Sequence, residues 1–329
     1  MAIATSAPTR IDLAGGTIDI WPLYLFHPGA QTLNAAISLR AAARVDRRDD
    51  SKIVIRSEDT NTTVEAAHWS ELRDRKELKL LSLLAHFFEA SGITLTTSCE
   101  SPAGAGIAGS SALNVAVCAA LAEWKRTHYE PEALLQVAMN VEAQAIDVPT
   151  GLQDYRPALY GGIAALELDV DGVRRIALDV SPADLESRIV LCYTGEPRNS
   201  GTNNWEITKR HIDGDRHIFD CFERIRDTAA AMRQALVAGD WDAVGRAIAE
   251  EWDNRKRLAP GVTTPGIESL IARAMAAGAT AAKVCGAGGG GCLFCYGPPD
   301  KHTAIREALA AGGARILDYR IEKHGLTRG

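Results

Sequence analysis

The sequence lacks the features that mark membrane, secreted and nucleic-acid-binding proteins. No apolar run reaches the roughly 18–20 residues of a membrane-spanning helix, and the start, MAIATSAPTRIDLAGG, lacks the basic-then-apolar order of a secretory signal. Lys and Arg number 36 against 42 Asp and Glu, a net charge of −6 with no basic stripe, which disfavours binding to nucleic acid or to an anionic membrane. We therefore expect a cytoplasmic protein whose partner is a small molecule.

Cysteine is present but gives no sign of a disulfide framework or a metal centre. The seven cysteines are odd in number and lie mostly in apolar stretches, as reduced core cysteines do. Cys292 and Cys295 spell C-x-x-C, but the segment reads as a buried strand, which would point the two sulfurs to opposite faces. Redox or metal chemistry at these thiols is disfavoured.

The length and composition are those of a globular protein. With 329 residues, 46% hydrophobic and 24% charged, the chain is long enough for about two domains. Strand and helix patterns alternate irregularly along it, which favours an α+β fold in two parts over a doubly wound parallel sheet. The composition shifts near Pro182, after which a strand at 189–193, three amphipathic helices, and a strand–glycine–strand unit follow. We place the domain boundary there, with residues 1–185 and 186–329 as the two units.

Hydrophobic periodicity, capping residues and turn residues predict where the strands and helices lie. Strands are expected at 6–13, 41–45, 53–55, 93–99, 163–168, 173–178, 281–285, 292–296 and 315–321. Helices are expected at 76–90, from 110 and from 131, then over 215–238, after an N-cap at Asp240, after an N-cap at Thr264, and over 303–311.

A glycine-rich loop precedes the helix that begins near Ser110. Gly104, Gly106 and Gly109 spell G-x-G-x-x-G, yet two helices follow the loop, so a dinucleotide-binding unit is excluded. The Walker pattern and the protein-kinase motifs are also absent. Glycines with positive φ and a helix N-terminus can cradle an anion through backbone N–H groups. The alternative is a tight strand-to-helix turn whose serines cap the helix.

Further residues fit phosphate chemistry. The run Gly286–Gly291 joins two buried strands and implies close backbone approach, either to a ligand or at a domain contact. Glu142 lies toward the C-terminal end of its helix, where the macrodipole disfavours a carboxylate, so a hard cation would account for it. Asp154 follows in a loop, where catalytic residues are common. Taken singly, each acid could be a solvated surface group.

Three motifs resemble those of the GHMP kinase superfamily, in the family's order. They are Ala7-Pro-Thr-Arg-Ile-Asp-Leu-Ala-Gly-Gly-Thr17-Ile-Asp19, Pro102-Ala-Gly-Ala-Gly-Ile-Ala-Gly-Ser-Ser-Ala112 and Lys283-Val-Cys-Gly-Ala-Gly-Gly-Gly-Gly-Cys292. The resemblance implies a ribosomal protein S5 domain 2-like N-terminal domain and a ferredoxin-like C-terminal domain.

Within the superfamily the chain is similar to the kinases of D-glycero-D-manno-heptose 7-phosphate. Their Ala-Gly-Gly-Gly-Thr-Asp, Gly-Lys-Gln-Asp-Gln and Thr-Gly plus Arg-x-Ser stretches correspond here to residues 14–19, 151–156 and 194–200. Three departures fall where the acceptor is expected: Leu152 replaces lysine, Tyr155-Arg156 replaces Gln-Tyr, and Thr17-Ile18 replaces Gly-Thr.

The resemblance implies transfer of the ATP γ-phosphoryl group to a hydroxyl of a sugar or sugar phosphate, most closely a heptose. Asp154 would accept the hydroxyl proton, Arg10 would orient Asp154, Ser111 and Glu142 would hold Mg²⁺, and Asp19 would bind sugar hydroxyls. The expected ATP-binding residues are Pro102, Gly104, Ala105, Gly106, Ile107, Ala108, Gly109, Ser110 and Ser111. The other expected acceptor-binding residues are Gly15, Gly16, Thr17, Gly151, Arg156, Gly288, Gly289 and Gly290.

Two other functions remain open. One is a mevalonate-type kinase, or a decarboxylase of a phosphorylated mevalonate, on the same fold. The other is a sugar-binding sensor without catalysis, against which the presence of Asp154, Arg10, Glu142 and both glycine loops argues. The oligomeric state is not fixed by the sequence, which is compatible with a homodimer.

Overall fold

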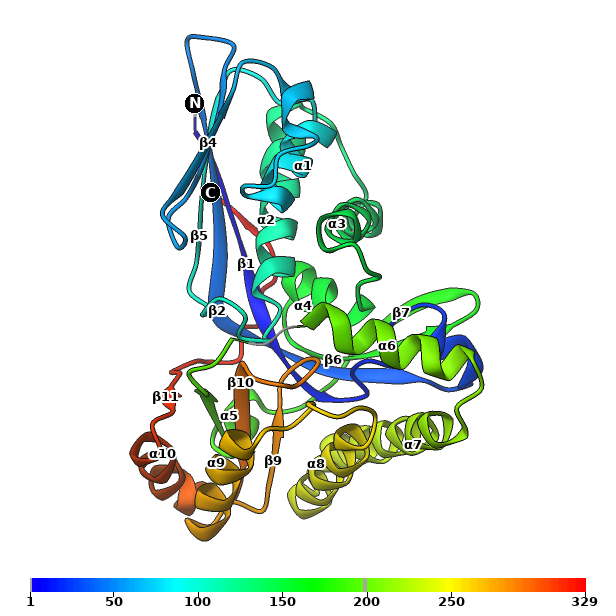
Figure 1. The fold of residues 1–329 in the computed structure, drawn as a ribbon. Coiled ribbons are helices and arrows are strands. Elements are labelled where there is room, and N and C mark those ends of the chain that lie inside the picture. The colour runs from blue at the N-terminus through cyan, green and yellow to red at the C-terminus, as the bar shows by residue number, and fades with distance from the viewer. Residues whose placement is uncertain (1, 198–199) are drawn as a thin grey trace.

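The computed structural model describes residues 2–197 and 200–329, and it divides the described chain between two sheets (Figure 1). Eight described strands form the first sheet. Its long central strands are amphipathic or wholly buried, as expected for a sheet with a helical layer on one face. The strand order is β12 (Thr327–Arg328), β1 (Ala2–Ala14), β2 (Gln31–Arg47), β5 (Ile93–Cys99), β3 (Ile53–Ser57) and β4 (Thr62–Ala66), with β6 (Ile163–Asp169) and β7 (Gly172–Ala177) continuing from β2.

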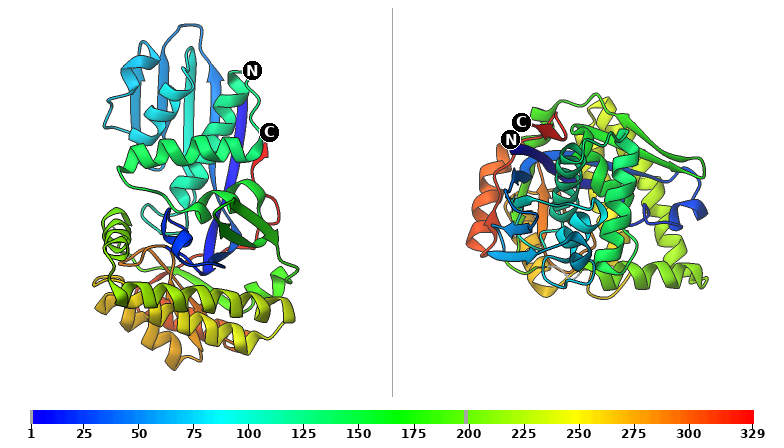
Figure 2. Two further views of the ribbon diagram at one scale, coloured as in Figure 1. Left: turned by 90° about the vertical axis from the view of Figure 1, so that its right-hand side faces the viewer. Right: turned by 90° about the horizontal axis from the view of Figure 1, so that it is seen from above.

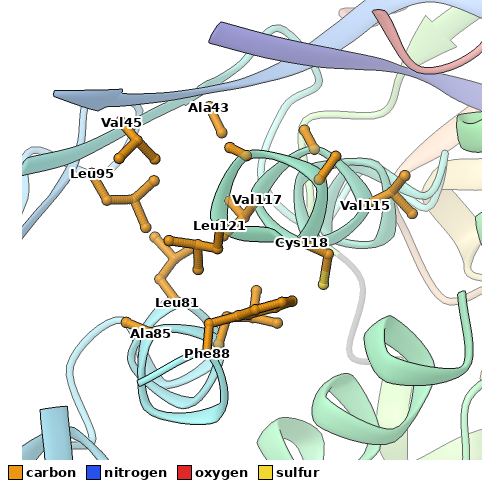
Figure 3. Packing of buried hydrophobic residues seen from close by; sticks show 14 of the residues in the cluster. Ala43, Val45, Leu81, Ala85, Phe88, Leu95, Val115, Val117, Cys118 and Leu121 are labelled. Atoms are coloured by element: carbon orange, nitrogen blue, oxygen red, sulfur yellow. The ribbon is translucent and has the colours of Figure 1, made fainter. Parts of the chain in front are cut away.

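Helices cover one face of this sheet and bury its core (Figures 1 and 2). Side chains of β2 and β5, among them Val45 and Leu95, meet α2 residues such as Val117 and Leu121, with Phe88 below them (Figure 3). The helical elements of this half are α1 (Lys79–Phe87), α2 (Gly109–Trp124), α3 (Pro131–Ile146), α4 (Tyr155–Tyr160), and the short 3₁₀ turns η1 (Leu23–Phe26), η2 (Trp69–Leu72) and η3 (Leu152–Asp154).

The second half is a four-stranded antiparallel sheet with helices on both faces. Its strand order is β11 (Arg315–Ile316), β8 (Ile189–Tyr193), β10 (Cys292–Tyr296) and β9 (Ala281–Val284). The helical elements are α5 (Pro182–Glu186), α6 (Ser200–Ile212), α7 (Arg216–Ala238), α8 (Trp241–Lys256), α9 (Pro265–Ala276), η4 (Pro299–Lys301) and α10 (His302–Ala311).

Strand β10 confirms the prediction for the C-x-x-C pair. Cys292 packs into the core on the α7–α8 side, whereas Cys295 packs with α9 and α10 on the opposite face. None of the seven cysteines, all of which lie in the described ranges, forms a disulfide. The predicted caps are also confirmed, because Asp240 accepts the N–H of Ala243 and Thr264 accepts the N–H of Ile267.

The predicted strand at 315–321 is wrong in extent. It ends at Ile316, because the chain then leaves the second sheet and returns to the first, where Ile321 bridges Ile37 and β12 pairs with β1. Both chain termini therefore lie on the first sheet (Figure 2). Within the described ranges, no helix combines the length and the apolar composition that crossing a bilayer requires.

Candidate active site

A cavity of about 360 Å³ collects most of the predicted nucleotide-binding and catalytic residues. Glu142 and Asp154 line it together with Thr150 and Gly151 of the segment that precedes α4. Asn204 of α6 lines it as well. Eight of the nine predicted ATP-binding residues also line this cavity: Pro102, Gly104, Ala105, Gly106, Ala108, Gly109, Ser110 and Ser111.

Ile107 differs from its neighbours in the loop. Its side chain is fully buried in the hydrophobic core beneath the cavity, and its carbonyl accepts the backbone N–H of Arg10 at 3.0 Å. Ile107 therefore anchors the loop and connects it to β1.

The loop has the backbone that an anion cradle requires. Gly104, Gly106 and Ala108 have φ values of +67°, +77° and +61°, and α2 begins directly afterwards at Gly109. Positive φ at alternating positions turns successive N–H groups inward, and the N-terminus of a 16-residue helix adds its partial positive charge. The loop is suited to hold phosphate oxygens.

Glu142 lies at the helix side of the cavity and is buried among hydroxyl and amide donors. Its Oε1 accepts from Ser110 Oγ at 2.8 Å and from Ser111 Oγ at 3.3 Å, and its Oε2 accepts from Asn114 Nδ2 at 3.4 Å. Burial raises the pKa of the Glu142 carboxyl, and no described Lys, Arg or His forms an ion pair with it. A buried carboxylate without a cationic partner, beside two hydroxyls at a phosphate loop, fits a hard divalent cation.

Tyr155 is one of the departures expected near the acceptor, and the structure corrects that placement. Its side chain is fully buried, and its hydroxyl donates to Glu142 Oε2 at 2.7 Å. It does not line the cavity. Tyr155 therefore fixes the orientation of Glu142 from below rather than contacting the acceptor.

Asp154 is held by Arg10 of β1. The Arg10 Nη2 and Nε atoms donate to Asp154 Oδ1 at 2.5 and 3.1 Å, and Nη1 donates to the carbonyl of Gly106 at 2.9 Å. Arg10 is 1% exposed, whereas the Asp154 side chain is 21% exposed and reaches the cavity. One guanidinium thus sets the position of the candidate base relative to the phosphate loop.

Asp19 lies beside Asp154 with a buried carboxyl group that is only half satisfied. Its Oδ2 accepts the backbone N–H of Gln153 at 2.8 Å, and its Oδ1 has no hydrogen-bond partner among the described residues. Burial, reinforced by the nearby Asp154 charge, raises the pKa of Asp19 from 3.8 to about 6. Asp19 does not line the described cavity, so its predicted bond to a sugar hydroxyl stays a prediction.

The glycines around Asp19 are required by close approach. A Cβ on Gly15 would lie 2.0 Å from the Gln31 carbonyl oxygen, and one on Gly151 would lie 2.5 Å from Asp19 Oδ2. A Cβ on Gly16 would lie 2.5 Å from Arg255 Nη2. These glycines allow residues 15–20, which are predicted to bind the acceptor and are called the acceptor loop below, to pack against the segment that carries Asp154. The Ile20–Gly151 bridge joins the two segments.

Thr17 and Arg156, both predicted to bind the acceptor, are buried and engaged with other protein groups. The Thr17 hydroxyl accepts from Arg255 Nη1 at 3.1 Å. Arg156 donates to Glu132 Oε2 at 2.6 Å and to the Leu152 carbonyl at 3.2 Å. Its Nε has no hydrogen-bond partner among the described residues.

The second glycine run packs against protein backbone of both halves, against Ala105 of the first half at Gly291 and against Val262 of the second half at Gly288 and Gly289. Cys292 N–H donates to the Ala105 carbonyl at 2.6 Å, and Gly289 N–H donates to the Val262 carbonyl at 2.8 Å. A Cβ on Gly288 would lie 2.5 Å from that same Val262 oxygen. Gly288, Gly289 and Gly290 do not line the described cavity, so their predicted contact with the acceptor stays a prediction.

Sequence reasoning missed several residues of the site. Asn204 lines the cavity with an unpartnered, buried Oδ1, but its helix α6 was not predicted. A buried cluster of charged side chains lies beside Arg10 and consists of Asp12, Glu251, Arg255 and Lys283. No local sequence pattern predicts this cluster, because its members come together only in the folded chain. Of the predicted 194–200 motif, Arg198 and Asn199 lie outside the described residues.

Comparison with known proteins identifies the family to which the chain belongs. A family model for the N-terminal domain of GHMP kinases matches residues 76–162, and one for their C-terminal domain matches residues 232–315. Two curated relatives cover nearly the whole chain. D-glycero-alpha-D-manno-heptose 7-phosphate kinase of Campylobacter jejuni is 28% identical over 98% of both chains. Mevalonate kinase of Thermococcus sibiricus is 24% identical over 99% of this chain and 98% of its own length.

A solved structure shows the same fold. The D-glycero-D-manno-heptose 1-phosphate kinase from Bacteroides thetaiotaomicron superposes with a TM-score of 0.80 over 99% of this chain and 98% of its own, at 24% identity. With both domain models matched in order and the phosphate loop, Glu142 and Asp154 around one cavity, the chain belongs to the GHMP kinase family and is an ATP-dependent phosphotransferase.

Proposed function

We propose that the protein transfers the γ-phosphoryl group of Mg²⁺-ATP to a hydroxyl of a sugar, namely a heptose or a heptose phosphate. The observation that carries this proposal is the placement of Asp154. The Asp154 side chain reaches the cavity beside the phosphate loop and accepts two hydrogen bonds from Arg10. The Asp19 carboxyl group, whose Oδ1 has no hydrogen-bond partner among the described residues, lies next to it. A base next to a hydroxyl-binding carboxyl group suits an alcohol acceptor.

Positioning and charge neutralisation supply most of the catalysis of phosphoryl transfer. Backbone N–H groups of Gly104–Ser111 and the N-terminus of α2 bind the ATP phosphates. Glu142 and Ser111, with Ser110 beside them, would hold Mg²⁺, which when bound neutralises charge on the phosphate oxygens. Tyr155 and Asn114 keep the Glu142 carboxylate turned toward the loop.

Asp154 accepts the proton of the acceptor hydroxyl as the reaction proceeds. Both Arg10 bonds go to Oδ1, so Oδ2 is the oxygen that takes the proton. The acceptor oxygen forms the new bond to the γ-phosphorus, and the bond from the γ-phosphorus to the β–γ bridging oxygen breaks, which releases ADP. Arg10, fixed by the Gly106 carbonyl, also offsets the negative charge that develops near the phosphate loop.

Two observations favour a sugar as the acceptor. The relative from Campylobacter jejuni is a heptose 7-phosphate kinase by name and matches 98% of this chain. The unpartnered Asp19 Oδ1 is suited to accept a hydrogen bond from a sugar hydroxyl. Gly15, Gly16 and Gly151 bring the backbone close to that oxygen.

A screen of acceptors tests the proposal. Release of ADP from Mg²⁺-ATP would be followed with heptoses, heptose 1- and 7-phosphates, hexoses, hexose phosphates, uronic acids, and mevalonate and its phosphates. A sugar that releases ADP and gains one phosphoryl group supports the proposal. Turnover of mevalonate alone would favour the function of the Thermococcus sibiricus relative. Release of CO₂ would indicate a decarboxylase, and sugar binding without ADP release would indicate a sensor.

Three predictions accompany the proposal: the domain boundary near residue 185, the cytoplasmic location, and the homodimer. All described strands before residue 182 belong to the first sheet and those from 189 to 316 belong to the second, while β12 returns to the first. Size-exclusion chromatography with light scattering measures the oligomeric state, and expression of 1–185 alone tests whether that unit folds.

A further inference from the structure

Thr17 has a backbone conformation that its side chain disfavours. Its φ is +74°, in the left-handed region that branched residues rarely adopt. Glycine takes this conformation without cost, whereas a residue with a branched Cβ does not. A non-glycine residue held in this conformation is strained, so surrounding contacts must fix it. Such a residue in an acceptor loop indicates a positioning role.

The contact that fixes Thr17 comes from the second half of the molecule. Arg255 of α8 is 1% exposed, and its Nη1 donates to Thr17 Oγ1 at 3.1 Å and to the Gly286 carbonyl at 3.0 Å. Its Nη2 and Nε donate to Glu251 Oε1 at 2.6 and 3.0 Å. One guanidinium therefore joins α8, the second glycine run and the acceptor loop.

Arg255 is itself held in place by buried charges. Lys283 Nζ lies 3.1 Å from Glu251 Oε2 and 3.4 Å from Asp12 Oδ2, and Arg255 Nη2 lies 3.6 Å from Asp12 Oδ2. Asp12 Oδ1 accepts the Gly286 N–H at 3.1 Å. Two acids and two bases, each at most 1% exposed, thus balance one another at the junction of β1, α8 and β9. Because these four charged groups are buried and lie 3.1–3.6 Å from their partners, their relative positions are strongly constrained.

We propose that Arg255 is a positioning residue that sets acceptor affinity through Thr17, an inference that rests on the proposed function. The bond fixes residue 17, and Asp19 follows two residues later in the same loop, which Ile20 joins to Gly151. The phosphate loop makes no hydrogen bond with either Thr17 or Arg255 in the described structure. Loss of the bond therefore loosens the acceptor site and leaves the nucleotide site in place.

The experiment compares Thr17→Val, Thr17→Ser and Arg255→Lys with the parent protein, with heptose 7-phosphate as the acceptor. Valine keeps the branched shape and removes the hydroxyl, whereas serine keeps the hydroxyl. Thr228→Val is the matched control, since Thr228 is also buried but its hydroxyl has no hydrogen-bond partner among the described residues. We measure KM for the acceptor, KM for ATP, and kcat.

We expect Thr17→Val to raise the acceptor KM about tenfold, as loss of a hydrogen bond to a charged group does, with the ATP KM changed less than about twofold. Thr17→Ser should restore most of the affinity, and Thr228→Val should match the parent. Thr17→Val combined with Arg255→Lys should raise the acceptor KM no further than Arg255→Lys alone. An acceptor KM unchanged in Thr17→Val, or an equal rise in both KM values, would overturn the inference.

A second measurement separates this inference from the proposed function. If the parent protein phosphorylates no sugar, the proposed function fails, and the bond is judged by urea unfolding of the two single variants and the double variant. Non-additive losses of stability support the bond between Thr17 and Arg255, and additive losses refute it. If Arg255→Lys does not fold, Thr17→Val and Thr17→Ser are compared in the same assays. A defect in Thr17→Val that Thr17→Ser does not share supports the bond, and equal behaviour of the two variants refutes it.

Discussion

Replacement of Asp19 by asparagine should make the protein more stable and less active with its acceptor. The Asp19 carboxyl group is 1% exposed, lies beside Asp154, and has an Oδ1 without a partner among the described residues. Asparagine keeps an oxygen that can accept the Gln153 N–H, and it carries no charge to bury. The substitution therefore removes an unfavourable buried charge at a site whose negative charge serves the ligand.

The magnitude follows from the pKa of Asp19, which burial raises from 3.8 to about 6. An acid whose pKa is higher in the folded chain binds protons more tightly there, so its contribution to stability is complete below pH 3.8 and is lost as the pH rises through about 6. A separation of roughly two pH units corresponds to about 3 kcal/mol. Asp19→Asn should gain that amount at pH 8, and about 2 kcal/mol of the gain should develop above pH 4.5.

Urea unfolding of the parent and of Asp19→Asn at several pH values measures this gain. Asp171→Asn, at an exposed carboxyl in the β6–β7 turn, is the control. It should change the free energy of unfolding little at any of these pH values, because water surrounds this side chain in the folded and in the unfolded chain. Two results would refute the assignment of a buried, half-satisfied carboxyl group. One is an Asp19→Asn variant that is less stable than the parent at pH 8. The other is a difference in the free energy of unfolding between the two proteins that does not grow with pH.

Three further substitutions test the rest of the site. Asp154→Asn should lower kcat by about 10²- to 10⁴-fold with an unchanged circular dichroism spectrum, and near-normal turnover would exclude Asp154 as the base. Glu142→Gln should raise the Mg²⁺ concentration needed for half-maximal activity. Tyr155→Phe removes a hydrogen bond to Glu142 and should raise that concentration about tenfold. Unchanged Mg²⁺ titrations in both variants would contradict the metal assignment. Lys283→Met should lower the free energy of unfolding by about 3–5 kcal/mol, because it leaves Asp12 and Glu251 short of a buried cation, whereas a loss below about 1 kcal/mol would show that the cluster is not held by its charges.

The parts of the fold that sequence reasoning predicted well have local causes. The Thr-rich strand at 93–99 alternates buried and half-buried residues along its length, and the caps at Asp240 and Thr264 act within three residues of their partners. Helix α6 was missed because its sequence, SGTNNWEITKRHI, is mostly polar and shows no clear apolar periodicity. The first half of β2 was missed because its residues are buried on both faces, which removes the alternation that marks a strand.

The candidate site likewise contains residues that the sequence predicted and residues that it did not. The resemblance to the GHMP kinases implied that the phosphate loop, Glu142 and Asp154 act together, and they line one cavity. The roles of Tyr155 and Arg255 could not be predicted, since Tyr155 contacts Glu142 across a helix–helix packing and Arg255 contacts Thr17 at a separation of 238 residues. Such contacts depend on how the elements pack, and a single sequence does not encode that in any local pattern.

The most direct test of the central claim follows the γ-phosphoryl group itself. The parent protein and Asp154→Asn would be incubated with Mg²⁺ and ATP isotopically labelled in the γ-phosphate, together with heptose 7-phosphate or heptose 1-phosphate. We predict that the label appears on a hydroxyl of the sugar with the parent protein and that its rate of appearance falls at least about 10²-fold with Asp154→Asn. Label found only in inorganic phosphate, or transferred equally fast by both proteins, would contradict the account.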